Sequence, residues 1–356
     1  MEGMLFERME QYDYENLYFC QDKSVGLKAV IAIHNTVLGP AAGGTRMWTY
    51  AAETDAIVDA MRLARAMTYK LAAVGANFGG GKCVVIGDAK RDKSDALLRS
   101  LGRFVHRLNG LFLTGVDVGT TARDFQIMRQ ETPYVVLEAG GGGLGESAVA
   151  TAFGVVQGMR ACLNAVYGSP DPQGRHVAVQ GIGAVGRDVV RRLVEAGASV
   201  TITDIDSEAV ARVASDYGVK TVAPEEIQRL PVDVYCPCAL GAVLNDQSIP
   251  ELRCRIVCGS ANNQLAEERH GDLLVQRDIL YAPDFIVNAG GSLSHLDTFN
   301  PGGFNLPRVE AAISHIYETM QHLIALSRER QIPTYRAAAT LAEQRIEKAR
   351  EQQVRH

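Results

Sequence analysis

The sequence lacks the features that assign a chain to a specialised class of protein. It has no run of basic residues and a formal net charge of −5 at pH 7, which gives no reason to expect a nucleic-acid partner. No apolar stretch approaches the roughly 18 residues that are needed to span a bilayer. The first residues turn acidic too early for a secretory signal. We therefore expect a cytoplasmic protein that binds neither nucleic acid nor membranes.

The seven cysteines show no spacing that is typical of a disulfide framework, which fits a reducing compartment. Two close pairs, Cys236 with Cys238 and Cys254 with Cys258, suggest a zinc site as one interpretation. The neighbouring residues favour another, because 232–236 and 255–258 have the pattern of buried strands, where cysteine behaves as a small hydrophobe. We expect structural thiols and no metal.

The length and composition indicate a globular protein of two domains. The chain has 356 residues, of which 47% are apolar and 22% charged, enough for two separate cores. From His176 onward, short apolar strands alternate with amphipathic helices, which is typical of βαβ units and a parallel sheet. We predict an α/β protein whose N-terminal domain, residues 1–140, is completed by a C-terminal helix at about 327–356. The glycine-rich residues 140–145 form the predicted hinge, and a Rossmann-type domain occupies residues 141–326.

The N-terminal half contains three predicted strands and two predicted helices. Residues 28–34 form an apolar strand that ends in a glycine-rich turn at 38–46. Residues 54–74 have the three-and-four spacing of a helix with one buried face, and Lys70 lies on or beside that face. The other predicted elements are a strand after Lys82, a helix at 94–108, a strand at 111–116, and two closing helices at 309–326 and 334–352.

A dinucleotide-binding fingerprint is the clearest motif of the C-terminal half. It follows the predicted strand 176–180 and precedes a helix-like segment, as the fingerprint requires. The alternative is a glycine-rich turn that only packs a helix on a sheet. Asp204 follows the last glycine by 18 residues, where a carboxylate binds the ribose hydroxyls and repels a 2′-phosphate, so we predict NAD as the cofactor. The fingerprint consists of Gly181, Ile182, Gly183, Ala184, Val185 and Gly186.

Two lysines and an aspartate form a second group of candidate residues. Lys82 follows three glycines and leads into an apolar strand, which is an unusual place for a surface charge. A lysine base that works near pH 8 must have its pKa lowered from about 10.4, by burial or by a nearby cation such as Lys70. Asp117 is suited to passing protons to and from an amine or water. Taken singly, Lys70 also fits a snorkelling lysine and Asp117 a turn-capping residue.

Several motifs in the same order resemble one enzyme family. They lie at residues 67–70, 79–82, 115–119, 238–241 and 259–264. Over essentially the whole chain, the sequence is similar to the glutamate/leucine/phenylalanine/valine dehydrogenases, most of all to the leucine and phenylalanine branches. The resemblance implies a substrate domain and a Rossmann domain separated by a cleft, and a homo-oligomer.

The resemblance also implies a reaction and roles for individual residues. The reaction is the reversible NAD-dependent conversion of an L-amino acid and water to a 2-oxo acid and ammonium. Lys82 would activate the water, Asp117 would move protons at the amine, and Lys70 with Asn262 would bind the substrate carboxylate. The residues implied to contact the cofactor beyond the fingerprint are Thr151, Ala239, Ser260 and Ala261.

The predicted side-chain pocket departs from the family pattern. Ala42, which precedes Gly43, stands where the glutamate branch has a lysine, so glutamate is disfavoured. Ala42 and Gly115 are smaller than the residues of the leucine branch, while Ser292 and His295 replace valines of the branched-chain enzymes. We therefore expect a large, aromatic substrate that resembles phenylalanine or tryptophan, with leucine or another branched-chain amino acid as the alternative. His295 either meets a polar group of the substrate or is bonded within its own fold.

Two other functions fit parts of the sequence. A hydroxy-acid or other NAD-dependent oxidoreductase fits the fingerprint, but it predicts a histidine–carboxylate pair and has no use for paired lysines. A non-catalytic nucleotide-binding protein fits the fold, but it does not explain why Lys70, Lys82 and Asp117 occur together.

Overall fold

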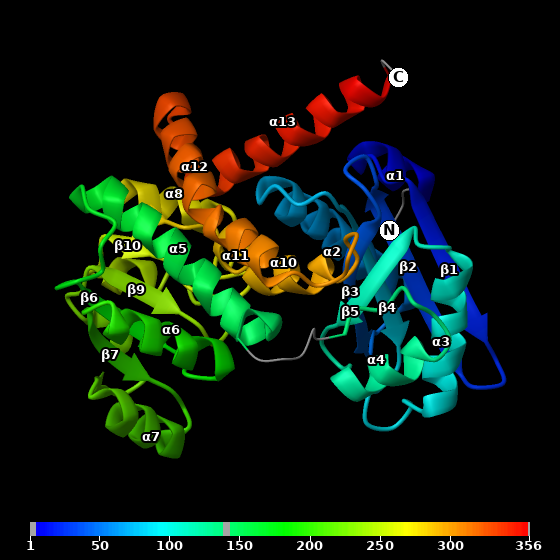
Figure 1. The fold of residues 1–356 in the computed structure, drawn as a ribbon, viewed down its shortest axis with the longest axis horizontal. Coiled ribbons are helices and arrows are strands. Elements are labelled where there is room, and N and C mark those ends of the chain that lie inside the picture. The colour runs from blue at the N-terminus through cyan, green and yellow to red at the C-terminus, as the bar shows by residue number, and fades with distance from the viewer. Residues whose placement is uncertain (1–4, 138–142, 355–356) are drawn as a thin grey trace. The chain divides into compact units, whose positions relative to one another are not determined.

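The computed structural model describes residues 5–137 and 143–354, which fold into two compact units (Figure 1). The first unit contains residues 5–137 together with 342–354, and the second contains residues 143–341. Residues 140–142 of the predicted hinge, and with them the predicted domain boundary, lie outside the described residues. Helix α13 (Thr334–Val354) contributes residues to both units.

The first unit is built on a mixed sheet of five strands in the order β1-β2-β4-β3-β5. Strands β1 and β2 pair antiparallel, as do β2 and β4, whereas β3 runs parallel to both β4 and β5. The strands are β1 (Asn16–Asp22), β2 (Leu27–Asn35), β3 (Ala41–Trp48), β4 (Gly79–Ile86) and β5 (Phe112–Val116). The helices of residues 5–137 are α1 (Leu5–Tyr12), α2 (Glu53–Ala73), α3 (Asp95–Arg107) and α4 (Ala122–Arg129).

Alternate residues of the central strand β2 face two different helix layers. Ala29, Ile31 and Ile33 belong to the core that is formed with α3 and α4, while Val30 and Ala32 pack against α2. A strand that is buried on both faces needs apolar residues at successive positions, and β2 has them. The sheet is therefore held between α2 and the pair α3–α4, which fixes where its strands end.

Strand β3 is the largest departure from the sequence prediction. The prediction of a turn that extends to residue 46 is wrong, because Ala41–Trp48 forms a strand between β4 and β5. Its glycines serve close packing within the sheet: a Cβ on Gly43 would lie 1.8 Å from the carbonyl oxygen of Gly81. Ala42 and Gly43 consequently lie inside the sheet.

Lys82 lies within a strand and not before its first residue, because β4 begins at Gly79. The glycines before it let α2 approach the strand closely. A Cβ on Gly80 would lie 2.2 Å from both the backbone nitrogen and the side-chain oxygen of Thr68. Since that spacing is far below van der Waals contact, α2 rests directly on the backbone of β4.

The last helix closes the carboxyl end of α2. The Arg345 guanidinium, on α13, donates hydrogen bonds to the backbone oxygens of Ala72 (3.1 Å), Gly75 (2.9 Å) and Ala76 (2.6 Å). The last carbonyl groups of a helix have no partners within it, so this arginine stabilises the end of α2 that carries Lys70.

The second unit contains six parallel strands in the order β11-β10-β9-β6-β7-β8, which confirms the predicted Rossmann-type architecture. The strands are β6 (His176–Gln180), β7 (Ser199–Thr203), β8 (Lys220–Thr221), β9 (Val234–Pro237), β10 (Ile256–Val257) and β11 (Leu280–Tyr281). Its α-helices before α13 are α5 (Ser147–Tyr167), α6 (Ala184–Glu195), α7 (Ser207–Tyr217), α8 (Arg269–Gln276), α9 (Asp284–Val287), α10 (Gly290–Asp297), α11 (Leu306–Ser314) and α12 (Ile316–Arg330). Three 3-10 turns are η1 (Gly143–Gly145), η2 (Ile227–Arg229) and η3 (Ile249–Glu251). The single helix predicted at 309–326 is thus two helices, which divide at His315.

Helix α5 corrects the expectation that no apolar stretch of membrane-spanning length exists. By length and composition it is apolar enough to cross a bilayer, but 61% of its most apolar window is buried inside the protein. It packs against α6, α10 and α12, as a core helix that is apolar on all sides must.

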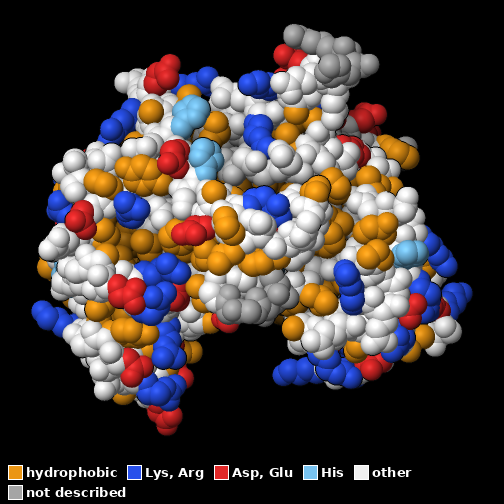
Figure 2. Space-filling model, in the orientation of Figure 1, with side chains coloured by type: hydrophobic (Ala, Val, Ile, Leu, Met, Phe, Trp, Pro, Cys, Tyr) orange, Lys and Arg blue, Asp and Glu red, His pale blue; other side chains and the backbone are white. Residues whose placement is uncertain are grey.

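The cysteines are free, and all but Cys238 are buried, as predicted. On the face of the molecule drawn in Figure 2, acidic and basic side chains are interspersed.

Candidate active site

Lys82 and Asp117 form an ion pair inside the first unit. Lys82, on β4, is only 6% exposed, and Asp117 follows β5 directly. Strand β3 lies between β4 and β5, and its Gly44 leaves the space in which the two side chains meet. A buried ammonium group without a partner would be strongly destabilising, so Asp117 is what allows Lys82 to occupy a strand interior.

The surroundings shift the pKa of both groups. Burial lowers the pKa of Lys82 from its ordinary value of 10.5, and the attraction of Asp117 offsets only part of this effect. Burial acts to raise the pKa of Asp117, but Lys82, the backbone of Val118 and Arg46 together outweigh it and lower that pKa from 3.8. The site therefore combines a carboxylate that stays ionised with a lysine that releases its proton more readily than a surface lysine does.

Two neighbouring residues fix the position of Asp117. A Cβ on Gly44 would lie 2.8 Å from the Cβ of Asp117 and 3.4 Å from Nζ of Lys82, so only glycine leaves the pair undisturbed. The Thr120 hydroxyl accepts a hydrogen bond from the backbone nitrogen of Asp117 at 3.0 Å and lies 2.9 Å from the backbone oxygen of Thr45. The loop after β5 is thereby tied to β3.

Arg46 is a site residue that the sequence interpretation missed. Its Nε lies 3.3 Å from Oδ2 of Asp117, and its Nη1 lies 2.9 Å from Oδ2 of Asp59 on α2. Tyr50 donates a 2.7 Å hydrogen bond to the same oxygen of Asp59. The turn assigned to residues 38–46 concealed this residue, because a strand at 41–48 would have predicted a cation beside the glycines of an inner strand.

The other candidates of the first unit lie on the same elements. Lys70 is half-buried in the last turn of α2. Ala42 is 1% exposed and pairs with Gly80 on one side and Leu113 on the other. Gly115, on β5, has Val136 beside it, and an added Cβ would lie 3.3 Å from the Cβ of Val136.

The fingerprint of the second unit has the backbone geometry of a phosphate-binding loop. Gly181 has a φ of +94°, and a Cβ there would lie 2.6 Å from that of Ala239. A Cβ on Gly186 would lie 2.0 Å from the backbone oxygen of Gly181, so the third glycine lets α6 pack closely on the loop. Gly183 is exposed with open space around its Cβ position, at the amino end of α6, where backbone N–H groups attract anions.

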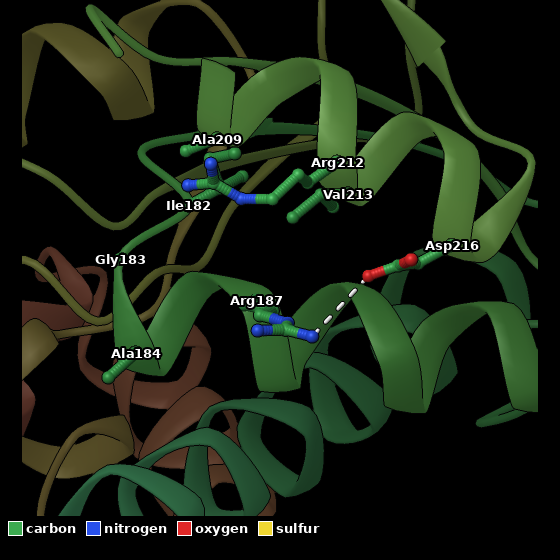
Figure 3. A pocket seen from close by; sticks show the side chains of 8 residues that line it. All are labelled: Ile182, Gly183, Ala184, Arg187, Ala209, Arg212, Val213 and Asp216. Atoms are coloured by element: carbon green, nitrogen blue, oxygen red, sulfur yellow. Dashed lines mark hydrogen bonds and ion pairs between the residues drawn. The ribbon is translucent and has the colours of Figure 1, made fainter. Parts of the chain in front are cut away.

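Asp204 holds this loop in place. Its Oδ2 accepts a 2.8 Å hydrogen bond from the backbone nitrogen of Ile182, and its Oδ1 accepts one of 3.1 Å from that of Asp206. A hollow between α6 and α7 opens beside the loop, with Ile182, Gly183, Ala184, Arg187, Ala209, Arg212, Val213 and Asp216 around it (Figure 3).

The remaining candidates of the second unit surround the amino end of α10. A Cβ on Gly291 would lie 2.7 Å from the hydroxyl of Thr151, so α10 packs directly against the start of α5. Asn262 is exposed, and its side-chain oxygen accepts a 2.7 Å hydrogen bond from Asn288, whose amide also donates to the backbone oxygen of Ser260 at 3.2 Å. Asn288 is thus a positioning residue that the motif 259–264 does not reveal. Ala261 is buried beside this segment.

Ser292 and His295 both lie half-buried on α10. The nearby Asp297 is held by Asn300 (3.0 Å), by the backbone nitrogen of Asn305 (2.7 Å) and by Arg308. This cluster ties α10 to the start of α11 and restrains the segment on which the two residues lie.

Comparison with known proteins identifies the family of this chain. Residues 15–134 match the model of the Glu/Leu/Phe/Val dehydrogenase dimerisation domain, and residues 206–353 match the model of the Glutamate/Leucine/Phenylalanine/Valine dehydrogenase domain. The chain belongs to this dehydrogenase family. It is therefore an amino-acid dehydrogenase, an oxidoreductase that acts on CH–NH2 donors.

Individual relatives of this dehydrogenase are similar over their whole length. The leucine dehydrogenase of Geobacillus stearothermophilus is 49% identical over 97% of this chain and 94% of its own. The phenylalanine dehydrogenase of Caldalkalibacillus thermarum is 43% identical over 98% of this chain and 95% of its own. The crystal structure of L-tryptophan dehydrogenase from Nostoc punctiforme superposes with a TM-score of 0.90 at 39% identity, covering 98% of this chain and 100% of that one.

The contact between Gly44 and the ion pair predicts the effect of a methyl group in this dehydrogenase. In Gly44→Ala, the new Cβ must displace Asp117, since 2.8 Å is too short for two carbon atoms. A displacement of about 1 Å at reacting groups costs roughly 100-fold in turnover. We expect a loss of that size in amino-acid deamination, while the melting temperature shows that the variant folds. Unchanged turnover in a folded variant would contradict the idea that this contact sets the geometry of the pair.

Proposed function

We propose that the protein catalyses the reversible, NAD-dependent oxidative deamination of an apolar L-amino acid, with leucine or another branched-chain residue as its main substrate. The observation that carries the proposal is the buried Lys82–Asp117 pair, in which burial lowers the pKa of the lysine. A lysine whose pKa lies below the ordinary lysine value, next to an ionised carboxylate, suits proton transfers at an amine and a water molecule.

The residues divide the proton chemistry between them. Lys70, helped by Asn262, would bind the substrate carboxylate, and Lys82 and Asp117 would act at the α-carbon and its amine. NAD⁺, which the fingerprint residues would hold, would supply the acceptor for the hydride of the α-carbon. Lys82 then takes a proton from the water whose oxygen bonds to the iminium carbon. Asp117 passes protons to and from the nitrogen until ammonia leaves and the 2-oxo acid remains.

The fingerprint residues fit a dinucleotide. The open space at Gly183 and the free amino end of α6 suit a pyrophosphate, because backbone N–H groups and the helix dipole attract its negative charge. Asp204, at the end of β7, supports NAD over NADP, since its carboxylate would repel a 2′-phosphate. Thr151, Ala239, Ser260 and Ala261 complete the proposed cofactor contacts.

Two substrate classes compete for the side-chain pocket. The expectation of an aromatic substrate rested on Ala42, Gly115, Ser292 and His295, but the leucine dehydrogenases are more similar to this chain than the phenylalanine dehydrogenase is. The comparisons therefore favour the branched-chain alternative. The aromatic class remains the second candidate because Gly115 lacks a side chain and the tryptophan dehydrogenase has a similar fold.

The larger organisation is also proposed from the family. We place the catalytic residues and the substrate-binding residues Lys70, Ala42, Gly43 and Gly115 in the first unit, completed by the C-terminal helix. The cofactor site and the substrate-binding residues Asn262, Ser292 and His295 belong to the second unit. A homo-oligomer is supported by the dimerisation domain that residues 15–134 match. The cytoplasm is the proposed location from the composition of the sequence.

A screen of 2-oxo acids tests the proposal directly. With ammonium and NADH, oxidation of NADH should be fastest with the 2-oxo acid of leucine, slower with those of phenylalanine and tryptophan, and absent with that of glutamate. Preference for the aromatic 2-oxo acids would favour the second candidate. No ammonium-dependent oxidation of NADH with any of them would refute the proposed function.

The role of Lys82 as the base predicts the behaviour of Lys82→Ala. General-base catalysis contributes roughly 100- to 10,000-fold, so kcat should fall by that factor. NADH binding, measured by fluorescence titration, should not change, because Lys82 and the fingerprint belong to different units. Lys93→Ala, which removes a lysine paired with Asp124 in the same unit, is the control for loss of a buried charge. Substantial activity in Lys82→Ala would exclude this lysine as the base.

The lowered pKa of Lys82 predicts the pH dependence of deamination. Only neutral Lys82 accepts a proton, and its fraction grows as the pH rises toward that lowered pKa. In the free enzyme, kcat/KM for deamination should therefore increase with pH and level off below the ordinary lysine value of 10.5. A rate that falls as the pH rises from 6 to 9 would contradict this assignment.

Gly115 predicts a change in substrate preference. In Gly115→Ala, the added methyl lies 3.3 Å from the Cβ of Val136, which can give way slightly. It narrows the proposed pocket, so kcat/KM should fall about tenfold more for phenylalanine than for leucine. An unchanged ratio between the two substrates would show that Gly115 does not face the substrate side chain.

A further inference from the structure

A chain of alternating charges leads from the Lys82–Asp117 pair to the surface of α2. Lys82 contacts Asp117, Asp117 contacts Arg46, and Arg46 contacts Asp59. The side chains of Arg46 and Asp59 are only 22% and 15% exposed, so solvent screens their charges less than it does on an open surface. At the outer end, Arg62 contacts the second oxygen of Asp59 at 2.9 Å and is mostly exposed.

We infer that Arg46 is a positioning residue of the deamination reaction, which holds the Asp117 carboxylate in place and remains as its cation when Lys82 is neutral. The inference rests on the proposed function, because it concerns the same pair of groups. Nε of Arg46 meets Asp117 while Nη1 is bound to Asp59, so the guanidinium bridges the end of β5 and helix α2 across β3.

The count of charges explains why a second cation is needed. A base must lose its proton in each turnover, and at that stage Lys82 no longer neutralises Asp117. A partly buried carboxylate without a countercharge would then be destabilised or take up a proton. With Lys82 neutral, Asp117 and Asp59 carry two negative charges, and Arg46 and Arg62 carry two positive ones. Arginine suits this task, since it stays protonated and binds two carboxylates at once.

The charged groups near Lys82 come from the elements packed around it. Asp117 lies directly after β5, Arg46 on β3 and Asp59 on α2. On the other side of Lys82, β2 places the uncharged Ala32 opposite it. Arg46 lowers the pKa of Lys82 by repulsion, and Asp59 raises it by attraction. Removing the charge of Arg46 should therefore raise the pKa of Lys82, and removing the charge of Asp59 should lower it. If Arg46 served only to join β3 to α2, its removal and that of Asp59 would not shift the pKa of Lys82 in opposite directions.

The test compares the pH profile of kcat/KM for deamination in four variants. In Arg46→Gln, the rise of kcat/KM with pH should move upward by about one pH unit. At a fixed pH on the acidic side of this rise, kcat/KM should therefore be roughly tenfold lower. In Asp59→Asn, the rise should move downward. Arg46→Lys keeps the charge but not the two-pronged contact, so it should leave the rise at the same pH and lose part of kcat. Arg99→Gln, which removes an ion pair between Arg99 on α3 and Glu131, should match the unmodified enzyme.

A second measurement separates this inference from the proposed function. The pH dependence of acylation of Lys82, followed by mass spectrometry, reports the same titration without turnover. An unmodified enzyme that shows no ammonium-dependent reaction would refute the proposed function. An active enzyme whose Arg46→Gln and Asp59→Asn variants show the same pH profile, acylation and kcat as the parent would overturn the inference. If Arg46→Gln does not fold, as shown by its melting curve, Arg46→Lys and Asp59→Asn decide the result.

Discussion

The rest of the first unit is arranged around an ammonium group buried in a β-sheet. Removing an ion from water costs several kcal/mol even after the protein relaxes, so Lys82 requires a carboxylate within contact distance. That carboxylate belongs to Asp117, in the loop after β5, and strand β3 lies between β4 and β5. The side chains of Lys82 and Asp117 can meet only where β3 has no side chain between them. Gly44 provides this gap in β3. The ion pair thus requires glycine at position 44 of the strand between Lys82 and Asp117.

The same constraint explains the glycines of β4. With no side chains at Gly80 and Gly81, the strand accepts α2 on one face and the ring of Phe112 on the other at distances that a Cβ would not allow. This close packing excludes water from the stem of Lys82, and exclusion of water is what lowers its pKa. The glycines before Lys82 therefore bring a helix close to the strand.

Regular elements and motifs could be predicted from the sequence, and unusual packing could not. The spacing of apolar residues located α2, and the strand His176–Gln180 was predicted with the bounds observed. Strand β3 was missed because glycine signals a turn unless neighbouring backbones are known to approach it. The role of Arg46 was missed for the same reason. No local pattern distinguishes one helix at 309–326 from two that divide at His315, since the apolar spacing continues through the break.

The candidate site of the second unit depends on backbone geometry, and that of the first unit depends on charged side chains. This difference bears on how members of the family can accept different substrates. In the second unit the loop is shaped by glycines and by hydrogen bonds of Asp204 to backbone nitrogens, so it depends on backbone geometry. In the first unit, the charges of Lys82, Asp117 and Arg46 are fixed by the sheet register. Gly115 lies on β5 two residues before Asp117, where a side chain can change without altering any of these charges. Relatives with different substrates can therefore keep one reaction, because the groups that move protons and the residues proposed to meet the side chain occupy separate positions on the same strands.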